Sequence, residues 1–218
     1  SAFFISEPLN ALAYGGDIME IEDDPYVSTP NGSVSVDTGY CVTSNTCIEA
    51  DFEMLDDQTS SVCVFETGAE KTADICGRIY VTGGLNFGWT YSNGGNFTSV
   101  GVTASTHSRR KAVIDSYNRV VSFMTCGVTN YTAAMTGTLT NNNAATTMKL
   151  FSGATGLWGY AKAKLYGLKI YESGVLRHDY VPGQCEGFGV LRDKVTGKVI
   201  FSYKSEPLAF GGKGIKEE

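Results

Sequence analysis

Three acidic residues, Glu49, Asp51 and Glu53, alternate with apolar residues in the segment CIEADFEM. Successive side chains of a strand point to opposite faces, so these three carboxylates would share one face. Two carboxyl groups roughly 5 Å apart can hydrolyse a glycosidic bond with retention of configuration. Residues four apart on a strand are separated by roughly 13 Å at the backbone, so Glu49 and Glu53 would have to lean together. The alternative interpretation is the solvated face of a half-buried strand.

A second group with possible chemistry lies in the segment WGYAKAKLY. If Ala161 and Ala163 face the core, the alternate residues face outward. These are Trp158, Tyr160, Lys162, Lys164 and Tyr166. Flat aromatic rings beside polar groups suit the two kinds of surface on a sugar. We therefore predict that Trp158, Tyr160, Lys162 and Tyr166 bind a glycan. Two alternatives remain: Gly159 could shift the register and bury Trp158, or the strand could be an ordinary surface strand with exposed tyrosines.

Metal and triad chemistry have weaker sequence support. Paired acids in loops could hold Ca²⁺, although most such pairs are merely solvated. The candidates are Asp23, Asp24, Asp56 and Asp57. Neither His107 nor His178 has a nucleophile at a recognisable spacing, which leaves a hydrolytic triad without sequence support. No cofactor other than calcium is indicated.

The six cysteines form no CxxC pair and are accompanied by only two histidines, which argues against a zinc site. Disulfides and free, buried thiols both remain open.

The elements that must carry these residues are strands. The chain has 218 residues, of which 26 are glycine and 5 are proline, and 18% are charged. Period-two alternation recurs in CIEADFEM and in GGLNFGWTYSNGG, which ends in turn residues. Together with turn residues at short intervals, it predicts a single all-β domain, an antiparallel two-sheet sandwich.

Local signals refine this prediction. The apolar phase slips at Gly167, which predicts a β-bulge. Hairpin turns are expected at residues 172–174 and near Thr196 and Gly197. A short helix is expected around residues 71–74. Polar residues dominate 105–111 and 130–147, which we interpret as loops or edge strands.

The charge pattern limits the partners. The net charge is −6, and the only basic cluster is Arg109, Arg110 and Lys111, so we expect no nucleic-acid partner. No run of roughly 18 apolar residues exists, so no membrane insertion is expected. The first residue is Ser rather than Met, which indicates a processed or truncated chain.

The order of motifs resembles a known family. YVSTPNGSVSVDTGY is followed by SNTCIEADFEM, ICGRIY and LNFGWTY, and then by AKAKLYGLKIYESGVLRHDYVPG and GFGVLRDKVTGKVIFS. Together they resemble the concanavalin A-like, or laminin-G-like, jelly rolls common in bacterial cell-surface and phage-associated proteins, from about Tyr26 to about Gly212. The resemblance implies two antiparallel sheets with the first and last strands close in space. It also implies an exported, extracellular or cell-surface protein, with a virion-associated protein as the alternative.

Laminarinase-like glycoside hydrolases share this fold and carry an E-x-D-x-E pattern. The resemblance would make Glu49 the nucleophile, Asp51 its electrostatic partner and Glu53 the acid/base. Such an enzyme needs an aromatic-lined cleft, yet Trp89 has the strand parity of Leu85 and Phe87, which favours a core position. The pattern therefore favours a non-catalytic domain.

One phrase occurs near both ends of the chain, SEPLNALAYGG and SEPLAFGG. We interpret residues 1–25 as an arm that could be the tail of a preceding repeat, 26–212 as the sandwich and 213–218 as a tail. Neighbouring copies would then contact one another through these segments, and one copy could complete the sheet of another. The alternatives are chance similarity or two segments selected alike at one edge of a sheet.

The resulting functional expectation is a non-catalytic, lectin-like binding or adhesion module, with a glycan or surface polysaccharide as the ligand, in a larger secreted multi-domain protein. A purely structural tandem repeat, a virion-associated domain and a glycoside hydrolase are the alternatives.

Overall fold

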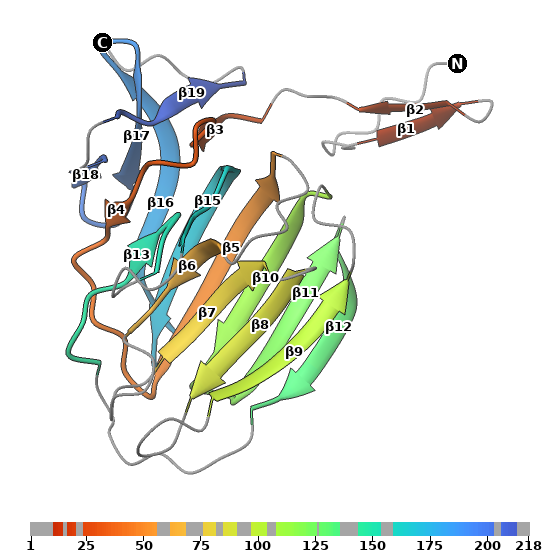
Figure 1. Cartoon of the computed structure of the whole chain (residues 1–218), viewed down its shortest axis with the longest axis vertical. Helices are drawn as coiled ribbons and strands as arrows, with labels where there is room; N and C mark the ends of the chain where they lie inside the picture. Colours follow the sequence, from red (N-terminus) through yellow and green to blue (C-terminus); the bar gives the residue numbers. More distant parts are fainter. Residues whose placement is uncertain are drawn as a thin grey trace.

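In a computed structural model, the chain forms a sandwich of two β-sheets (Figure 1). The structure describes residues 11–14, 17–20, 24–55, 62–68, 76–81, 85–90, 97–103, 108–125, 127–135, 144–153, 159–202 and 206–212, with the backbone alone for 11–20 and 76–103. None of these residues is helical, and accordingly no helix that could cross a membrane is found among them.

The larger sheet has ten strands in the described part of the chain, with its main path in the order β12-β11-β10-β5-β15-β16-β17-β18. These are β5 (Thr46–Met54), β10 (Arg110–Asp115), β11 (Val120–Thr125), β12 (Val128–Ala134), β15 (Ala163–Glu172), β16 (Val175–Cys185), β17 (Phe188–Asp193) and β18 (Val199–Ile200). The short strands β3 (Tyr26–Ser28) and β19 (Ala209–Gly211) extend it beside β15.

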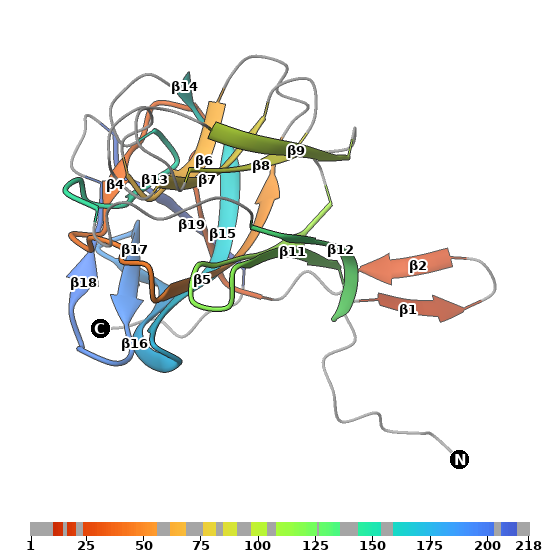
Figure 2. The ribbon, with the colours of Figure 1, turned by 90° about the horizontal axis from the view of Figure 1, so that it is seen from below.

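The smaller sheet has seven strands among the residues that the structure describes, and it covers the larger sheet, as the edge-on view shows (Figure 2). Its main path is β4-β13-β6-β7-β8-β9, and β14 pairs with β6. These are β4 (Val36–Asp37), β6 (Val62–Glu66), β7 (Cys76–Val81), β8 (Leu85–Thr90), β9 (Phe97–Thr103), β13 (Lys149–Leu150) and β14 (Gly159–Tyr160). Every described strand pair in the two sheets is antiparallel except β6 with β14. Separately, β1 (Ala11–Tyr14) pairs with β2 (Asp17–Glu20).

Strand β5 confirms the predicted alternation. From Thr46 to Met54 every second residue is buried, and the residues between them, Glu49, Asp51 and Glu53 included, are half-buried on the outward face. The buried side chains of β5 pack into a core shared with β6, where Phe52 and Phe65 are both 1% exposed. Because one face of the larger sheet packs against this core, only its other face is available for contacts with other molecules.

The predicted β-bulge is confirmed. Along β15, Leu165 pairs with Phe52 and Gly167 pairs with Asp51, so Tyr166 is the extra residue. Both hairpin predictions are also confirmed. Ser173 and Gly174 have positive φ between β15 and β16, and Gly197 has a φ of 75° after β17. Residues 130–134 lie in β12, an edge strand, as expected.

Several predictions fall outside the described residues. The short helix around residues 71–74 and the turn at 92–95 belong to this group. Trp89 lies in β8, but its side chain is not described.

The last strand closes the sheet beside the first. Strand β19 pairs antiparallel with β3, with Ala209 opposite Ser28 and Gly211 opposite Tyr26. This arrangement matches the expectation that the first and last strands of the sandwich lie close together.

Candidate functional site

The outward face of β5 carries the predicted carboxylates, and two of them are bound by side chains from distant parts of the sequence. Asp51 accepts two hydrogen bonds from Arg109, from Nε at 3.0 Å and from Nη2 at 2.9 Å. Glu53 accepts a 2.8 Å hydrogen bond from the Tyr166 hydroxyl. Glu49 shares the face and lies opposite Val113 on β10 and Lys169 on β15.

Arg109 is the centre of this cluster. It also donates a 2.6 Å hydrogen bond to Asp24, and its guanidinium lies 3.7 Å from the centre of the Tyr166 ring. Burial opposes the charged form of Arg109, but the hydrogen bonds and charges of Asp51 and Asp24 raise its pKa. The pKa of Tyr166 is raised by burial and by its bond to Glu53. A planar cation that binds one carboxylate with two nitrogens and stacks on a ring makes a rigid arrangement.

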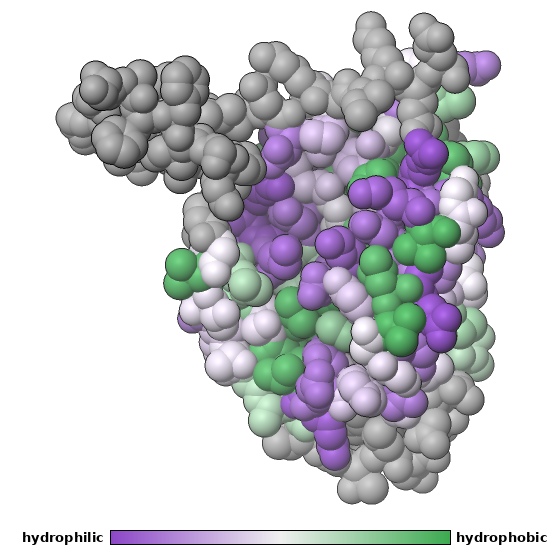
Figure 3. Space-filling view, turned by 180° about the vertical axis from the view of Figure 1, so that it is seen from behind, coloured by the Kyte–Doolittle hydropathy of each residue, from purple (hydrophilic) through white to green (hydrophobic). Residues whose placement is uncertain are grey.

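Residues predicted for three different chemistries therefore meet in one place. Asp24 was a calcium candidate, Asp51 and Glu53 were catalytic candidates, and Tyr166 was a glycan candidate. Arg109 and Tyr26 were not predicted as members, although the Tyr26 ring meets the Tyr166 ring edge-on at 5.7 Å. The hydrogen-bond donors and acceptors of the cluster largely pair with one another. This is the pattern of a structural contact that holds the chain before β3 against the larger sheet. From behind, hydrophilic residues gather over the upper ends of β5 and β10 (Figure 3).

The predicted aromatic strip does not run along a single sheet. Ala161 and Ala163 are fully buried, as predicted. Between Tyr160, which ends β14, and Ala163, which begins β15, the chain passes from the smaller sheet to the larger one. Tyr160 lies in β14 of the smaller sheet, whereas Tyr166 lies in β15 of the larger sheet. Lys162 lies between these strands, and Trp158 lies outside the described residues. Tyr160, Lys162 and Tyr166 are each half-buried, so a glycan site formed by these residues with Trp158 stays a prediction, although Tyr160 and Tyr166 belong to different sheets.

A hollow that the sequence did not predict lies where the β15–β16 hairpin meets the β17–β18 turn. Its volume is about 610 Å³, within the range of small-molecule sites. It is lined by Tyr40, Cys41, Thr43, Glu172, Leu176, Arg177, His178, Val195 and Thr196.

Glu172 forms one wall of this hollow and is held by three hydroxyl groups. It accepts hydrogen bonds from Tyr40 at 2.7 Å and Thr46 at 2.9 Å, and a third from Thr43. Burial opposes ionisation, but the three hydroxyls and the nearby Arg177 lower the pKa of Glu172. Burial and the bond to Glu172 raise the pKa of Tyr40 to about 12. The site therefore presents a fixed carboxylate and an un-ionised phenol at neutral pH.

His178 forms another wall and is oriented by Asp193. Its Nδ1 lies 2.7 Å from Asp193 Oδ2, and its ring stacks on Tyr180 at 5.5 Å and meets Tyr40 edge-on at 5.3 Å. Burial would raise the pKa of Asp193, but hydrogen bonds from Thr196, the Asp179 amide, His178 and the Val195 amide lower it to about 2.

Sequence reasoning missed this site because the His178 partner is not the adjacent Asp179. Asp193 is fifteen residues away and comes from the turn of the next hairpin. A signal was present: His178 has the strand parity of Tyr180, which is 2% exposed. An ionisable residue at a core-facing position needs a buried partner.

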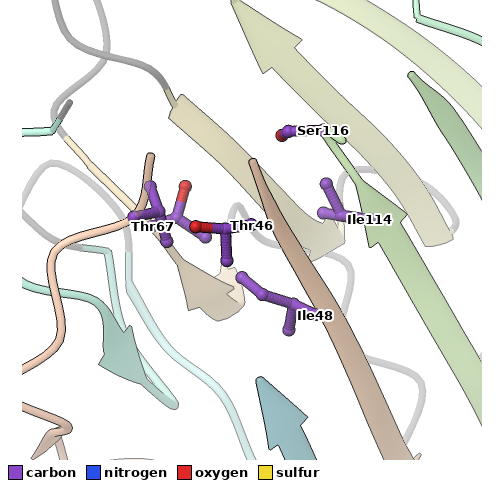
Figure 4. Close-up of a pocket in the computed structure, with 6 residues that line it drawn as sticks. Thr46, Ile48, Thr67, Ile114 and Ser116 are labelled. Atoms are coloured by element: carbon purple, nitrogen blue, oxygen red, sulfur yellow. The ribbon is translucent and has the colours of Figure 1, made fainter. Parts of the chain in front are cut away.

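A smaller cavity of about 10 Å³ lies inside the sandwich, lined by Val42, Thr46, Ile48, Thr67, Ile114 and Ser116 (Figure 4). It has room for about one water molecule and not for a ligand. Neither hollow is lined by Glu49, Asp51 or Glu53.

Metal and thiol candidates can be placed only in part. Among the described residues no group of three or more His, Cys, Asp or Glu could hold a metal ion. Asp24 binds Arg109, whereas Asp23, Asp56 and Asp57 lie outside the described residues, so the calcium site stays a prediction. Among the described cysteines, Cys41, Cys47, Cys63 and Cys185 are not in disulfides, and the Cys63 thiol donates a 3.1 Å hydrogen bond to the Phe65 carbonyl.

No family model matches the sequence, and no curated protein matches it. Solved structures do match the fold. One is a candidate carbohydrate-binding protein from Bacteroides ovatus, 11% identical, with a TM-score of 0.51 over 88% of this chain and 59% of that one. Another is the LG4-5 pair of the mouse laminin α1 chain, 9% identical, with a TM-score of 0.50 over 94% of this chain and 73% of that one. The chain therefore has the fold of the concanavalin A-like, laminin-G-like jelly-roll domains.

Proposed function

We propose that this domain is a non-catalytic carbohydrate-binding module and that the hollow between Tyr40 and His178 is its ligand site. The observation that carries the proposal is the convergence there of two aromatic rings, a fixed carboxylate and an exposed guanidinium. Sugars are bound by this combination, because rings cover the apolar face and planar polar groups bond the hydroxyls. The fold shared with a candidate carbohydrate-binding protein agrees with the proposal.

Hydrogen-bonding capacity remains at the site. Within the described part of the chain, Arg177 is exposed and makes no hydrogen bond, so its five N–H donors face solvent. The Nε2 atom of His178 is the ring nitrogen that Asp193 does not use. Both groups can contact a ligand without first breaking an internal bond, which lowers the cost of binding.

A glycan-array screen of the purified chain tests the proposal, with the variants Arg177→Ala and Glu172→Gln beside it. Lys169→Ala is the matched control, because Lys169 is an exposed cation on the outward face of the same strand as Glu172. We expect binding of at least one glycan that falls tenfold or more in both site variants and stays unchanged in the control.

Two other results would redirect or end the proposal. Binding that survives in both site variants and disappears with Trp158→Ala would move the site to the Trp158, Tyr160 and Lys162 segment. A folded chain that binds nothing on the array would contradict carbohydrate binding altogether.

The wider setting follows from the resemblance noted in the sequence. We propose that the domain acts outside the cell, in a protein with further copies of the same sandwich. The free, exposed thiols of Cys41 and Cys185 give a direct check on compartment, because mass spectrometry of the protein from its native source shows whether they are oxidised.

A further inference from the structure

The side chains that line the hollow direct most of their hydroxyl protons away from it. Tyr40 and Thr43 both donate to Glu172. Thr196 donates a 2.6 Å hydrogen bond to Asp193 Oδ2. A hydroxyl group has one proton and two lone pairs. Because the proton is already used, each of these three hydroxyls offers a ligand only an acceptor.

The proton of the His178 ring is fixed in a similar way. Its Nδ1 atom lies 2.7 Å from Asp193 Oδ2. Burial opposes the ionisation of Asp193, but its hydrogen bonds lower its pKa to about 2, so the carboxylate has no proton to donate at neutral pH. The proton between the two groups therefore belongs to Nδ1. In the neutral imidazole, Nε2 then carries a lone pair and is an acceptor.

This Nε2 atom is open to the hollow. It has no hydrogen-bond partner in the described part of the chain, and it is not one of the buried side-chain atoms that lack a partner, so it is accessible to solvent. Of the residues that line the hollow, Arg177 alone adds a permanently charged donor. The lining is therefore rich in acceptors and poor in donors.

The charges around the hollow disfavour an acidic ligand. Glu172 and Asp193 are both ionised at neutral pH, because the pKa of each is lowered. Burial opposes the ionisation of Glu172, but hydroxyl hydrogen bonds and the charge of Arg177 favour it. The cation is thus already partly balanced by a carboxylate. A carboxylate or sulfate on the ligand would meet two fixed negative charges.

We propose that the hollow binds a neutral glycan through the protons of its hydroxyl groups, and that His178 Nε2 accepts one of these protons. Sugar hydroxyls donate as well as accept, so they suit acceptors that surround one charged donor. Protonation of His178 would turn Nε2 from an acceptor into a donor, so binding should weaken as the pH falls. Naming this class of ligand rests on the proposed function, whose site it shares.

A pH series separates the imidazole from its neighbours. Imidazole is the side chain whose charge ordinarily changes between about pH 5 and 8. Glu172 and Asp193 stay ionised over this range, because the pKa of each lies below it. The titratable or charged side chains that contact the His178 ring or line the hollow with it come from β15, β16, β17 and the segment before β5, and they are Glu172, Arg177, Tyr180, Asp193, Tyr40 and Cys41.

The test is the glycan array run at about pH 7.5 and about pH 5 with the wild type, His178→Gln and His107→Gln. His107 is the only other histidine of the chain, which makes His107→Gln the matched control. We expect neutral glycans to bind, and their binding to the wild type and to His107→Gln to fall about tenfold at the lower pH, because fewer molecules then carry a free Nε2. His178→Gln cannot titrate and should bind more weakly, with no change between the two pH values. Circular dichroism checks that each protein is folded at both.

Nuclear magnetic resonance tests the position of the proton without any ligand. Long-range proton–nitrogen correlation spectra of the nitrogen-labelled chain distinguish the two neutral forms of imidazole, and His107→Gln assigns the signals. We expect the neutral His178 ring to carry its proton on Nδ1. A proton on Nε2 would overturn the inference.

The array results distinguish the ligand class from the proposed function. A folded chain that binds nothing would contradict both. Binding confined to acidic glycans, or wild-type binding that is equal at the two pH values, would keep carbohydrate binding and overturn the role given to His178. A fall in binding at the lower pH that persists in His178→Gln would overturn that role as well.

Discussion

At the scale of single residues, Asp193 shows how one buried carboxylate organises a surface. Its side chain is 1% exposed and accepts four hydrogen bonds. One comes from the Val195 amide of the turn, one from the Asp179 amide of β16, and two from His178 and Thr196, whose side chains line the hollow. The turn and the orientation of His178 therefore depend on the same group. A neutral or shorter side chain would leave several buried donors without partners.

The first prediction concerns this carboxylate. A pKa lowered from 3.8 to about 2 corresponds to about 2 kcal/mol of stabilisation at neutral pH. Because the folded pKa lies below the unfolded one, this stabilisation is present above about pH 4 and is lost as the pH falls through 2. We expect Asp193→Asn to lower the free energy of unfolding by about 2 kcal/mol at pH 7, measured by urea denaturation.

The neighbouring carboxylate supplies the control. The Asp179 amide donates to Asp193, but no described hydrogen bond involves the Asp179 side chain, so Asp179→Asn should change stability by less than about 0.5 kcal/mol. Equal losses in the two variants, or a loss in Asp193→Asn that stays the same at pH 2, would contradict the assignment.

Sequence pattern could predict the face of a residue but not its partner. The shared face of Glu49, Asp51 and Glu53 could be predicted because every second side chain of a strand points to the same face. The bond from Arg109 to Asp51 spans 58 positions and that from Tyr166 to Glu53 spans 113, and no local pattern specifies such pairs. Strand order decides them, and strand order was available only from the fold.

At the scale of elements, the strands that show strict alternation or a turn signal were predictable. Strand β5, the bulge at Gly167 and the two hairpins each follow from a few adjacent residues. The crossing from β14 to β15 could not be predicted. Ala161 and Ala163 would be buried whether the chain stayed in one sheet or passed to the other. The hollow was missed for a related reason, since it draws on four segments that meet only at the end of the sandwich.

The second prediction concerns the packing of β17 against β19. A Cβ atom at Gly189 would lie 2.6 Å from the Ala209 carbonyl oxygen. We expect Gly189→Ala to displace β19 and to lower the free energy of unfolding by about 2 kcal/mol. Hydrogen exchange followed by mass spectrometry should show faster exchange in residues 206–212.

Gly183, on the paired strand β16, is the control for this substitution. A Cβ atom there would lie 3.4 Å from a Val190 methyl group, which is a tight but tolerable contact. Gly183→Ala should leave exchange in β19 unchanged. Unaltered protection of residues 206–212 in Gly189→Ala would show that the two strands do not depend on one another.

At the scale of the whole molecule, a single core joins the two sheets. Side chains from β5, β10 and β15 of the larger sheet and from β6 and β13 of the smaller one belong to one buried cluster. The fold class could be predicted because the amino-acid composition and the alternation of apolar and polar residues directly reflect the burial of one face of each strand in this core. The position of the hollow could not be predicted, since it lies at the margin of the core, where its lining is largely polar.

The third prediction concerns this shared core. Phe52 is 1% exposed at its centre, so Phe52→Ala should lower the free energy of unfolding by about 3–5 kcal/mol. Phe201 is 63% exposed, and Phe201→Ala should change it by less than about 0.5 kcal/mol. Tryptophan fluorescence and circular dichroism should show coincident urea transitions in the wild type, whereas separate transitions would mean that the sheets unfold independently.

The pairing of β3 with β19 also decides how the domain would respond to tension. Tyr26, where β3 begins, lies opposite Gly211, where β19 ends, so a pull on both ends of the sandwich acts at the same end of one antiparallel pair. The hydrogen bonds of that pair then break one after another instead of sharing the load. Under mechanical force β19 would therefore detach before the longer central strands, and its loss would expose the edge of β3 and the Gly189 amide of β17.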